Sequence, residues 1–436
     1  MLPVIAIVGR PNVGKSTLFN RLAKKRNSLV DDMPGVTRDR LYATVNWKDV
    51  EFLLVDTGGF DTSLQGTIAE GIRRQVEIAI EEADVIILMF DGKTGPILDD
   101  QELTSILRQS DKRIFYAVNK IDGPEHEGLS LEFYSLGIKH VLPVSSAHGY
   151  GIAALMDEVT SGLPPSESKE KDEEHINIAL IGRPNVGKSS LINKIIGSDR
   201  LLVSETPGTT RDSVNIYFER KAHSYMFIDT AGIRRKSRVK EKIEKFSMIK
   251  ALKTISMAHI SIILIDSEAG LCEQDLRICG YALDEGCGII IAFNKWDLIK
   301  NDRSRINSLN NAIDRQLSFI PFVPRLNISA LTGENVRKLF SIMENIWTQY
   351  NTTIATPVIN NMLKSITEDH PPPYVGGRGI NFFYSTQVSV RPPVFVIFVN
   401  RPDAIIASYK RYIMNQFRKR LGFSHIPIKI FYRERQ

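Results

Sequence analysis

The residues Gly9-Arg10-Pro11-Asn12-Val13-Gly14-Lys15-Ser16 decide the fold, and the same eight residue types occur again in the same order at 182–189. An apolar run directly precedes each copy. The pattern Gly-x-x-x-x-Gly-Lys-Ser between a strand and a helix is typical of a phosphate-binding loop, because its backbone amides and the helix N-terminus face an anion. The probability that chance produced two matches in this setting is negligible.

Three further segments repeat at nearly the same spacing. The segment Pro-Gly-Val-Thr-Arg-Asp at 34–39 recurs with one change at 207–212, and Asp-Thr-Gly-Gly at 56–59 recurs as Asp-Thr-Ala-Gly at 229–232. Asn-Lys-Ile-Asp at 119–122 recurs as Asn-Lys-Trp-Asp at 294–297. One domain is therefore present twice. Because each copy alternates apolar strands with helical stretches, we expect two α/β domains, each with a mostly parallel sheet and helices on both faces.

The chain of 436 residues is long enough for several cores. We expect a first domain at 1–163, a charged linker at 164–175, a second domain at 176–350 and a small α+β domain at 351–436. In the last domain the expected order is a helix from Thr356, strands at 380–390 and 394–399, a helix from about Pro402 and a strand at 426–432. The first domain has 17 Lys and Arg against 23 Asp and Glu, whereas the last has 12 against 4. This basic C-terminal segment suggests a polyanionic partner.

The residues expected around the phosphates occupy equivalent positions in the two copies. Lys15 and Lys188 would neutralise the β- and γ-phosphates. Thr37 and Thr210 lie on loops that can reach the γ-phosphate, and with the two lysines they form the expected catalytic set. The expected Mg²⁺ ligands are Ser16, Thr37 and Asp56 in the first copy, and Ser189, Thr210 and Asp229 in the second.

Asn-Lys-x-Asp selects the base. A carboxylate can accept hydrogen bonds from both N1–H and the 2-amino group of guanine, whereas adenine offers no such donor pair. The expected nucleotide-binding residues of the first copy are Gly9, Asn12, Val13, Gly14, Lys15, Ser16, Thr17, Asp56, Gly59, Asn119, Lys120, Asp122, Ser145, Ser146 and Ala147. Those of the second are Gly182, Asn185, Val186, Gly187, Lys188, Ser189, Ser190, Asp229, Gly232, Asn294, Lys295, Asp297, Ser329, Ala330 and Leu331.

Together these motifs resemble the translation-factor-type GTPases of the Ras superfamily. The tandem arrangement with a third, basic domain resembles the EngA (Der) family of bacterial ribosome-assembly GTPases over essentially the whole chain. The resemblance implies hydrolysis of GTP to GDP with Mg²⁺, a KH-like C-terminal domain, and the large ribosomal subunit with its rRNA as partner.

Phe60 and Ile233 occupy the position where Ras-like enzymes carry a water-orienting Gln. Similar GTPases with this substitution bind K⁺ through an Asn of the phosphate loop, and Asn12 and Asn185 match that Asn. We hypothesise that K⁺ supplies the missing positive charge. The alternative is that these Asn residues only stabilise the loop turn.

Basic side chains suggest two RNA contacts. Lys410, Arg411, Arg418, Lys419 and Arg420 lie along the last predicted helix, where they either contact phosphate or only keep the helix soluble. The basic stretch at 234–240 is either a nucleotide-gated contact or a solvated helix face. A different class of function, a nucleotide-gated RNA-binding scaffold in which one GTPase domain is only a sensor, also stays open.

The longest apolar runs are too short to span a bilayer, and the N-terminus has no basic region or cleavage site typical of a signal peptide. We therefore expect a cytoplasmic protein with no membrane partner. We also expect it to be a monomer.

Overall fold

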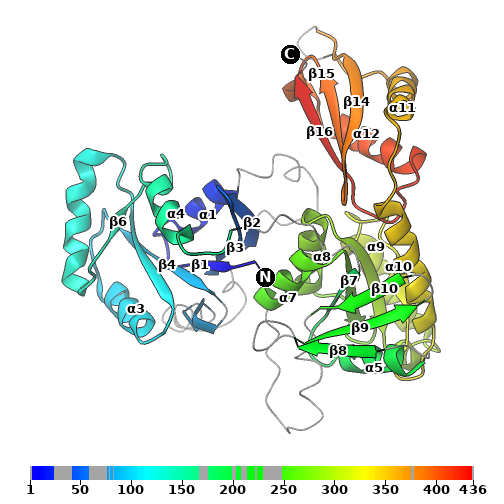
Figure 1. Cartoon of the computed structure of the whole chain (residues 1–436), viewed down its shortest axis with the longest axis horizontal. Helices are drawn as coiled ribbons and strands as arrows, with labels where there is room; N and C mark the ends of the chain where they lie inside the picture. Colours follow the sequence, from blue (N-terminus) through cyan, green and yellow to red (C-terminus); the bar gives the residue numbers. More distant parts are fainter. Residues whose placement is uncertain are drawn as a thin grey trace. The chain divides into compact units, whose positions relative to one another are not determined.

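The computed structural model describes residues 2–23, 42–57, 76–77, 79–81, 83–165, 175–198, 203–207, 214–220, 223–228, 248–374 and 378–434 (Figure 1). The described residues form two compact units, one up to residue 165 and one from residue 175 onward. No helix in these described ranges is both long and apolar enough to cross a membrane.

The first unit is built on a six-stranded sheet in the order β2-β3-β1-β4-β5-β6. Its strands are β1 (Val4–Val8), β2 (Tyr42–Trp47), β3 (Val50–Asp56), β4 (Val85–Asp91), β5 (Arg113–Asn119) and β6 (Leu142–Pro143). Its helices are α1 (Lys15–Ala23), α3 (Leu98–Arg108), the 3-10 helix η2 (Pro124–Leu136) and α4 (Ile152–Thr160). Among the described strands of this unit, only β2 and β3 pair antiparallel. Every residue of β1 and β4 is buried, as expected for central strands covered on both faces.

The second unit contains a seven-stranded sheet in the order β13-β12-β11-β7-β10-β9-β8. Its strands are β7 (Ile176–Ile181), β8 (Val203–Pro207), β9 (Val214–Arg220), β10 (His223–Phe227), β11 (Ile260–Asp266), β12 (Gly288–Asn294) and β13 (Arg325–Asn327). Its helices are α5 (Lys188–Ser198), α7 (Met248–Met257), α8 (Glu273–Asp284), η4 (Trp296–Leu298), α9 (Arg303–Gln316) and α10 (Val336–Tyr350). Helices α7 and α8 pack together against the sheet, and α5 packs against α10. The two sheets confirm the predicted α/β fold class.

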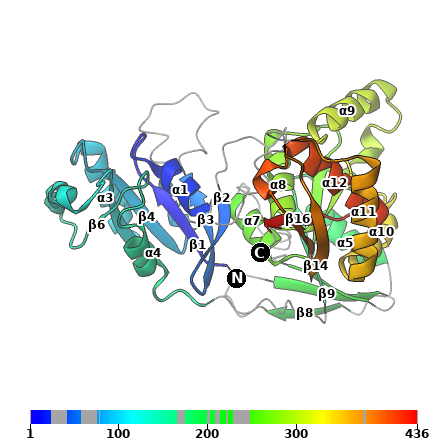
Figure 2. The ribbon, with the colours of Figure 1, turned by 90° about the horizontal axis from the view of Figure 1, so that it is seen from above.

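A smaller α+β fold completes the second unit. It consists of α11 (Thr356–Asp369), β14 (Phe382–Val390), β15 (Pro393–Val399), η5 (Pro402–Ala404), α12 (Ala407–Arg420) and β16 (Lys429–Glu434). The sheet order is β14-β15-β16, antiparallel and then parallel. Helices α11 and α12 contact each other and lie beside this sheet (Figure 2). The predicted order α-β-β-α-β is confirmed, and the 3-10 turn η5 is an addition to it.

The two sheets of the second unit share one hydrophobic cluster. It includes Phe340 and Ile346 of α10 together with Phe395 of β15 and Phe417 of α12. Tyr350 at the end of α10 belongs to this cluster, and its hydroxyl donates to the carbonyl oxygen of Gly286 within the second α/β fold. Lys429 Nζ of β16 donates to the carbonyl oxygen of Asp284 at 2.7 Å, and Arg418 of α12 stacks on Phe322 with its guanidinium carbon 3.6 Å from the ring centroid. The three-stranded sheet is therefore joined to the second α/β sheet by apolar and polar contacts.

Candidate functional site: two guanine-nucleotide sites

The first phosphate-binding loop, between β1 and α1, depends on close approaches of its backbone to neighbouring segments. Gly14 has a φ of +99°, and a Cβ atom there would lie 2.2 Å from Nδ2 of Asn119. A Cβ atom at Gly9 would lie 2.5 Å from the carbonyl oxygen of Met89. Asn12 has a φ of 65°, in the left-handed region that Asn tolerates better than most residues. Positions 9 and 14 therefore need glycine, as the sequence pattern implies.

Lys15 is the first residue of α1, directly after this loop, and is only 7% exposed. Its Nζ donates to the carbonyl oxygens of Gly9 at 2.7 Å and Arg10 at 2.8 Å. Burial lowers the pKa of Lys15, while the negative charge of Asp56 acts in the opposite direction. Ser16 Oγ donates to Oδ2 of Asp56 at 2.7 Å. A hydroxyl and a carboxylate oxygen therefore converge near the lysine, and such oxygens suit Mg²⁺.

The second loop, between β7 and α5, repeats this geometry. Lys188 Nζ donates to the carbonyl oxygens of Gly182 at 2.7 Å and Arg183 at 2.8 Å. Gly187 has a φ of +100°, and a Cβ atom there would lie 2.3 Å from Nδ2 of Asn294. Both lysines are therefore held in the same way, by the carbonyl oxygens at the start of their own loops.

The structure describes some of the other predicted site residues and not the rest. Val13 and Val186 are buried, whereas Thr17, Asn185 and Ser190 are exposed and Ser189 is half-buried. Thr37, Gly59, Phe60, Thr210, Asp229, Gly232, Ile233 and the basic stretch 234–240 lie outside the described residues.

Asn119 and Asn294 each join two loops. Asn119 Nδ2 donates to the carbonyl oxygen of Val13 at 2.7 Å, and its Oδ1 accepts from the backbone N–H of Ser146 at 2.8 Å. Asn294 makes the matching two hydrogen bonds: its Nδ2 donates to the carbonyl oxygen of Val186 at 2.7 Å, and its Oδ1 accepts from the backbone N–H of Ala330 at 2.8 Å. In each copy one amide side chain thus holds the phosphate loop against the loop predicted to reach guanine.

The lysine of each Asn-Lys-x-Asp motif is held by an aspartate that the sequence analysis missed. Lys120 Nζ lies 2.5 Å from Oδ2 of Asp91, and Lys295 Nζ lies 2.5 Å from Oδ2 of Asp266. Burial raises the pKa of Asp91, but the bond from Lys120 and a backbone N–H lower it overall; Asp266 behaves in the same way. Both aspartates end an apolar strand, 175 residues apart like the two Asn-Lys-x-Asp motifs, and that spacing could have identified them.

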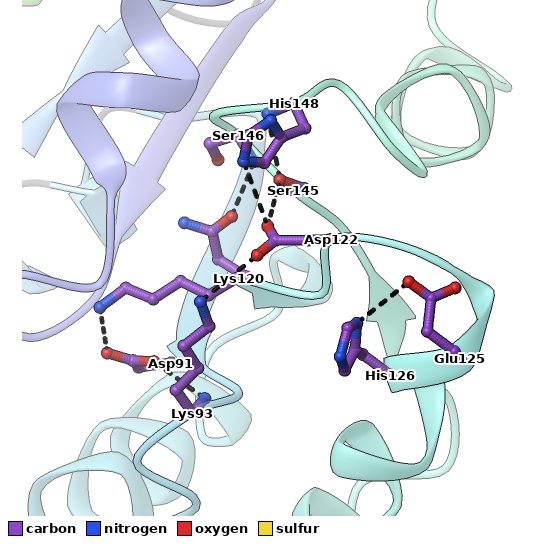
Figure 3. Close-up of polar contacts among 10 residues, drawn as sticks. Asp91, Lys93, Lys120, Asp122, Glu125, His126, Ser145, Ser146 and His148 are labelled. Carbon is purple, nitrogen blue, oxygen red and sulfur yellow. Dashed lines mark hydrogen bonds and ion pairs between the residues drawn. The ribbon is translucent and has the colours of Figure 1, made fainter.

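The carboxylate predicted to read guanine in the first copy is surrounded by donors (Figure 3). Asp122 Oδ1 accepts from Ser145 Oγ at 2.8 Å, and its Oδ2 lies 3.3 Å from Lys93 Nζ. His148 Nε2 lies 3.9 Å from Oδ1. The Ser145 hydrogen bond, with a smaller contribution from Lys93, lowers the pKa of Asp122. These donors favour the ionised form of the carboxylate.

Asp297 has a different setting. Its Oδ1 is buried and has no hydrogen-bond partner within the described part of the chain. The loop beside it matches the first copy, since Ser329 Oγ accepts from the N–H of Thr332 at 3.1 Å as Ser145 Oγ does from His148. Leu331 is 79% exposed. A buried, unpartnered carboxylate oxygen is what a donor edge such as that of guanine would satisfy.

Two more residue pairs support the loops and were not predicted. Arg10 Nε lies 3.3 Å from Oδ1 of Asp100, and Arg183 Nη2 lies 3.3 Å from Oδ2 of Asp275. Both aspartates are fully buried in the first turn of a helix, and burial raises the pKa of each. The loops are thus anchored to α3 and α8. In addition, Arg21 of α1 donates to the carbonyl oxygens of Ser146 and Ala147.

The predicted RNA-contact residues on α12 differ in what they touch. Lys419 and Arg411 are exposed, and Lys410 Nζ lies 5.9 Å from the ring centroid of Tyr432. Arg420 Nη2 lies 2.7 Å from Oδ2 of Asp369. Arg418 instead stacks on Phe322, in the segment between α9 and β13, and burial lowers its pKa to about 10.

Comparison with known proteins matches this architecture. A protein-family model described as "50S ribosome-binding GTPase" matches residues 4–120 and 177–295, and one described as "KH-domain-like of EngA bacterial GTPase enzymes, C-terminal" matches residues 353–433. GTPase Der of Geotalea daltonii is 45% identical over 436 residues, 100% of this chain and 99% of that relative. GTPase Der of Thermoanaerobacter pseudethanolicus is 46% identical over 433 residues, 99% of this chain and 98% of that relative.

Two phosphate-binding loops, each followed by its own Asn-Lys-x-Asp motif, define a tandem P-loop GTPase with a KH-like C-terminal domain. The chain belongs to the GTPase Der family, and its activity is the hydrolysis of GTP.

Proposed function

We propose that the chain couples GTP hydrolysis at both of its sites to the assembly of the large ribosomal subunit in the cytoplasm, and that it acts as a monomer. The observation that carries this proposal is the pairing of two matched nucleotide sites with a C-terminal segment of 12 Lys and Arg against 4 Asp and Glu. Basic side chains supply most of the affinity of proteins for RNA phosphates. The description of the matching family model, which names the 50S ribosome, supports the same partner.

At each site the chain's own residues position GTP and stabilise the negative charge on its phosphates. Water attacks the γ-phosphate in line with the departing oxygen of GDP, and Lys15 or Lys188 neutralises the charge on the β- and γ-phosphates. The Asn119 and Asn294 bridges fix each phosphate loop relative to its base-binding loop.

Mg²⁺ would be held by Ser16, Thr37 and Asp56 in the first copy, and by Ser189, Thr210 and Asp229 in the second. When bound, it supplies positive charge to the phosphate oxygens.

Separate Lys15→Ala and Lys188→Ala variants test whether both sites turn over. Removing one such cation at a site typically lowers its rate by about 10²-fold or more. We therefore expect each single variant to keep only the turnover of its other site, and the double variant to lose turnover. If one single variant keeps the full rate and the other loses it, one domain is only a sensor, and the nucleotide-gated scaffold is the correct description.

The proposed K⁺ role at Asn12 and Asn185 has its own test. Asn12 and Asn185 both have a positive φ, 65° and 63°, within their phosphate-binding loops. If K⁺ supplies charge to the transition state, GTP turnover in KCl exceeds turnover in NaCl at matched ionic strength, and Asn12→Asp or Asn185→Asp changes that ratio. Equal rates in the two salts would leave these residues with a role in loop geometry only.

The ribosomal partner is tested by co-sedimentation with purified large subunits. We compare a non-hydrolysable GTP analogue, GDP and no nucleotide, at low and physiological salt. Binding that depends on the analogue, and that weakens when Lys410, Arg411, Lys419 and Arg420 are replaced by Ser, supports the proposal. Absence of binding in every state would contradict the partner and leave the GTPase activity unaffected.

A further inference from the structure

The two predicted guanine-reading carboxylates have different neighbours. Lys93 Nζ lies 3.3 Å from Oδ2 of Asp122 in the first site (Figure 3). The matching position in the second site holds Glu268. The match is structural, because the backbone N–H of Lys93 donates to Asp91 at 3.0 Å and that of Glu268 donates to Asp266 at 2.9 Å.

A second position also carries a more basic side chain in the first site than in the second. His148 Nε2 lies 3.9 Å from Oδ1 of Asp122, and Thr332 holds the matching position in the second site. In both copies this residue's N–H donates to the preceding serine hydroxyl, Ser145 or Ser329, at 3.1 Å. Both substitutions place the more basic side chain at the first site.

The oxygens of the two carboxylates are engaged to different extents. Asp122 has Ser145 on Oδ1 and Lys93 on Oδ2, whereas Oδ1 of Asp297 is buried without a partner among the described residues. Glu268 is directed to Arg305 of α9, with Oε1 3.1 Å from Nη1. An ammonium group beside a carboxylate occupies a lone pair and weakens the negative potential that a donor edge meets.

We propose that Lys93 is a specificity-determining residue that makes the first site less selective for the guanine 2-amino group than the second site, where Glu268 replaces it. The 2-amino group and N1–H form a donor edge that needs the full negative potential of the carboxylate. The inference rests on the proposed base-reading role of Asp122 and Asp297.

The test compares GDP with IDP, which lacks the 2-amino group but carries the same phosphates. Affinities are measured on the full-length chain by competition with mant-GDP, with Lys188→Ala present so that the first site is observed. The charge of residue 93 acts on the phosphates of both ligands alike, so the ratio Kd(IDP)/Kd(GDP) isolates its effect on the base. Partly exposed ion pairs of this kind change affinity by roughly two- to fivefold.

We expect Lys93→Glu to raise this ratio by about that factor, and Lys93→Arg, which keeps the charge, to leave it unchanged. In the Lys15→Ala chain, Glu268→Lys gives the mirror experiment and lowers the ratio at the second site. A ratio that is unchanged or lower in Lys93→Glu would overturn the inference, because the change of charge would then have no effect on base reading.

Asp122→Asn separates this outcome from failure of the base site itself. An amide in place of the carboxylate offers a donor to the C2 carbonyl of xanthine, so preference should move from GDP to XDP. If that switch does not occur, the base-reading role of Asp122 is wrong and the inference fails with it. If the switch occurs while Lys93→Glu leaves the ratio unchanged, only the role of Lys93 is refuted.

Discussion

The side chain of Asn119 satisfies two buried backbone groups at once, the carbonyl of Val13 and the N–H of Ser146. Asn119→Ala leaves both groups unpaired, and each such loss costs about 1–3 kcal/mol. We expect the variant to weaken GDP binding at the first site and to lower the stability of the first unit, as measured by mant-GDP titration and urea unfolding. Asn294→Ala should do the same for the second site. If neither affinity nor stability changes, the bridge is dispensable.

Sequence alone predicts residues whose chemistry is local, and it misses residues that act through the fold. Lys15 is identifiable because its loop pattern is local, and in the structure its Nζ donates to the carbonyl oxygens of Gly9 and Arg10 within that same pattern. Asp91 and Asp100 were missed because their partners, Lys120 and Arg10, lie 29 and 90 residues away in the chain. Only the folded chain brings each pair into contact. Arg418 looked like its basic neighbours on the helix, and only the fold shows it stacked on Phe322.

At the scale of elements, the phosphate loops leave no space for a methyl group at their second glycine. Gly14→Ala and Gly187→Ala would each place a Cβ atom against a bridging Asn, at 2.2 and 2.3 Å, in a backbone conformation that alanine rarely adopts. We expect each variant to lose nucleotide binding at its own site by at least about tenfold, since displacing the Asn breaks the bridge, which is a loss of more than 1 kcal/mol.

Gly128→Ala and Gly197→Ala are the matched controls for this prediction, because a Cβ atom at either position meets no atom within 4 Å. Nucleotide titration of the four variants compares their affinities, and we expect only Gly14→Ala and Gly187→Ala to bind nucleotide more weakly. Equal binding by Gly14→Ala and Gly128→Ala would show that the loop can open to admit the methyl group.

Most strands follow from apolar runs in the sequence, and the deviations have physical causes. The expected strand at 380–390 begins at Phe382, which pairs with Val399, the last residue of β15; a register shift follows between Phe382 and Tyr384. The expected strand at 426–432 begins later, at Lys429, which pairs with Val394 near the start of β15, although Ile426 and Ile428 before it are also buried. Apolar residues show where a segment is buried, but pairing with a neighbour decides where a strand begins.

At the scale of the whole molecule, the two compact units predict two unfolding transitions. In the second unit, the cluster shared by α10, β15 and α12 should make the second α/β sheet and the C-terminal sheet unfold together. Calorimetry of the full chain should therefore show two transitions, both raised by GDP. Lys188→Ala should abolish the GDP shift of one transition and leave that of the other. Three separate transitions would contradict a joined second unit.

Helix α10 connects two places that have different roles. It begins at Val336, three residues after Gly333 of the predicted base-reading loop, whose N–H donates to the carbonyl oxygen of Ser329. It ends at Tyr350, which belongs to the hydrophobic cluster shared with the C-terminal sheet. Its 15 residues form a rod about 22 Å long. A tilt of a rigid helix of this length by a few degrees displaces its far end by roughly one or two ångströms. A change in the base-reading loop of the second site that tilts α10 would therefore move the end of α10 that packs against the basic C-terminal domain.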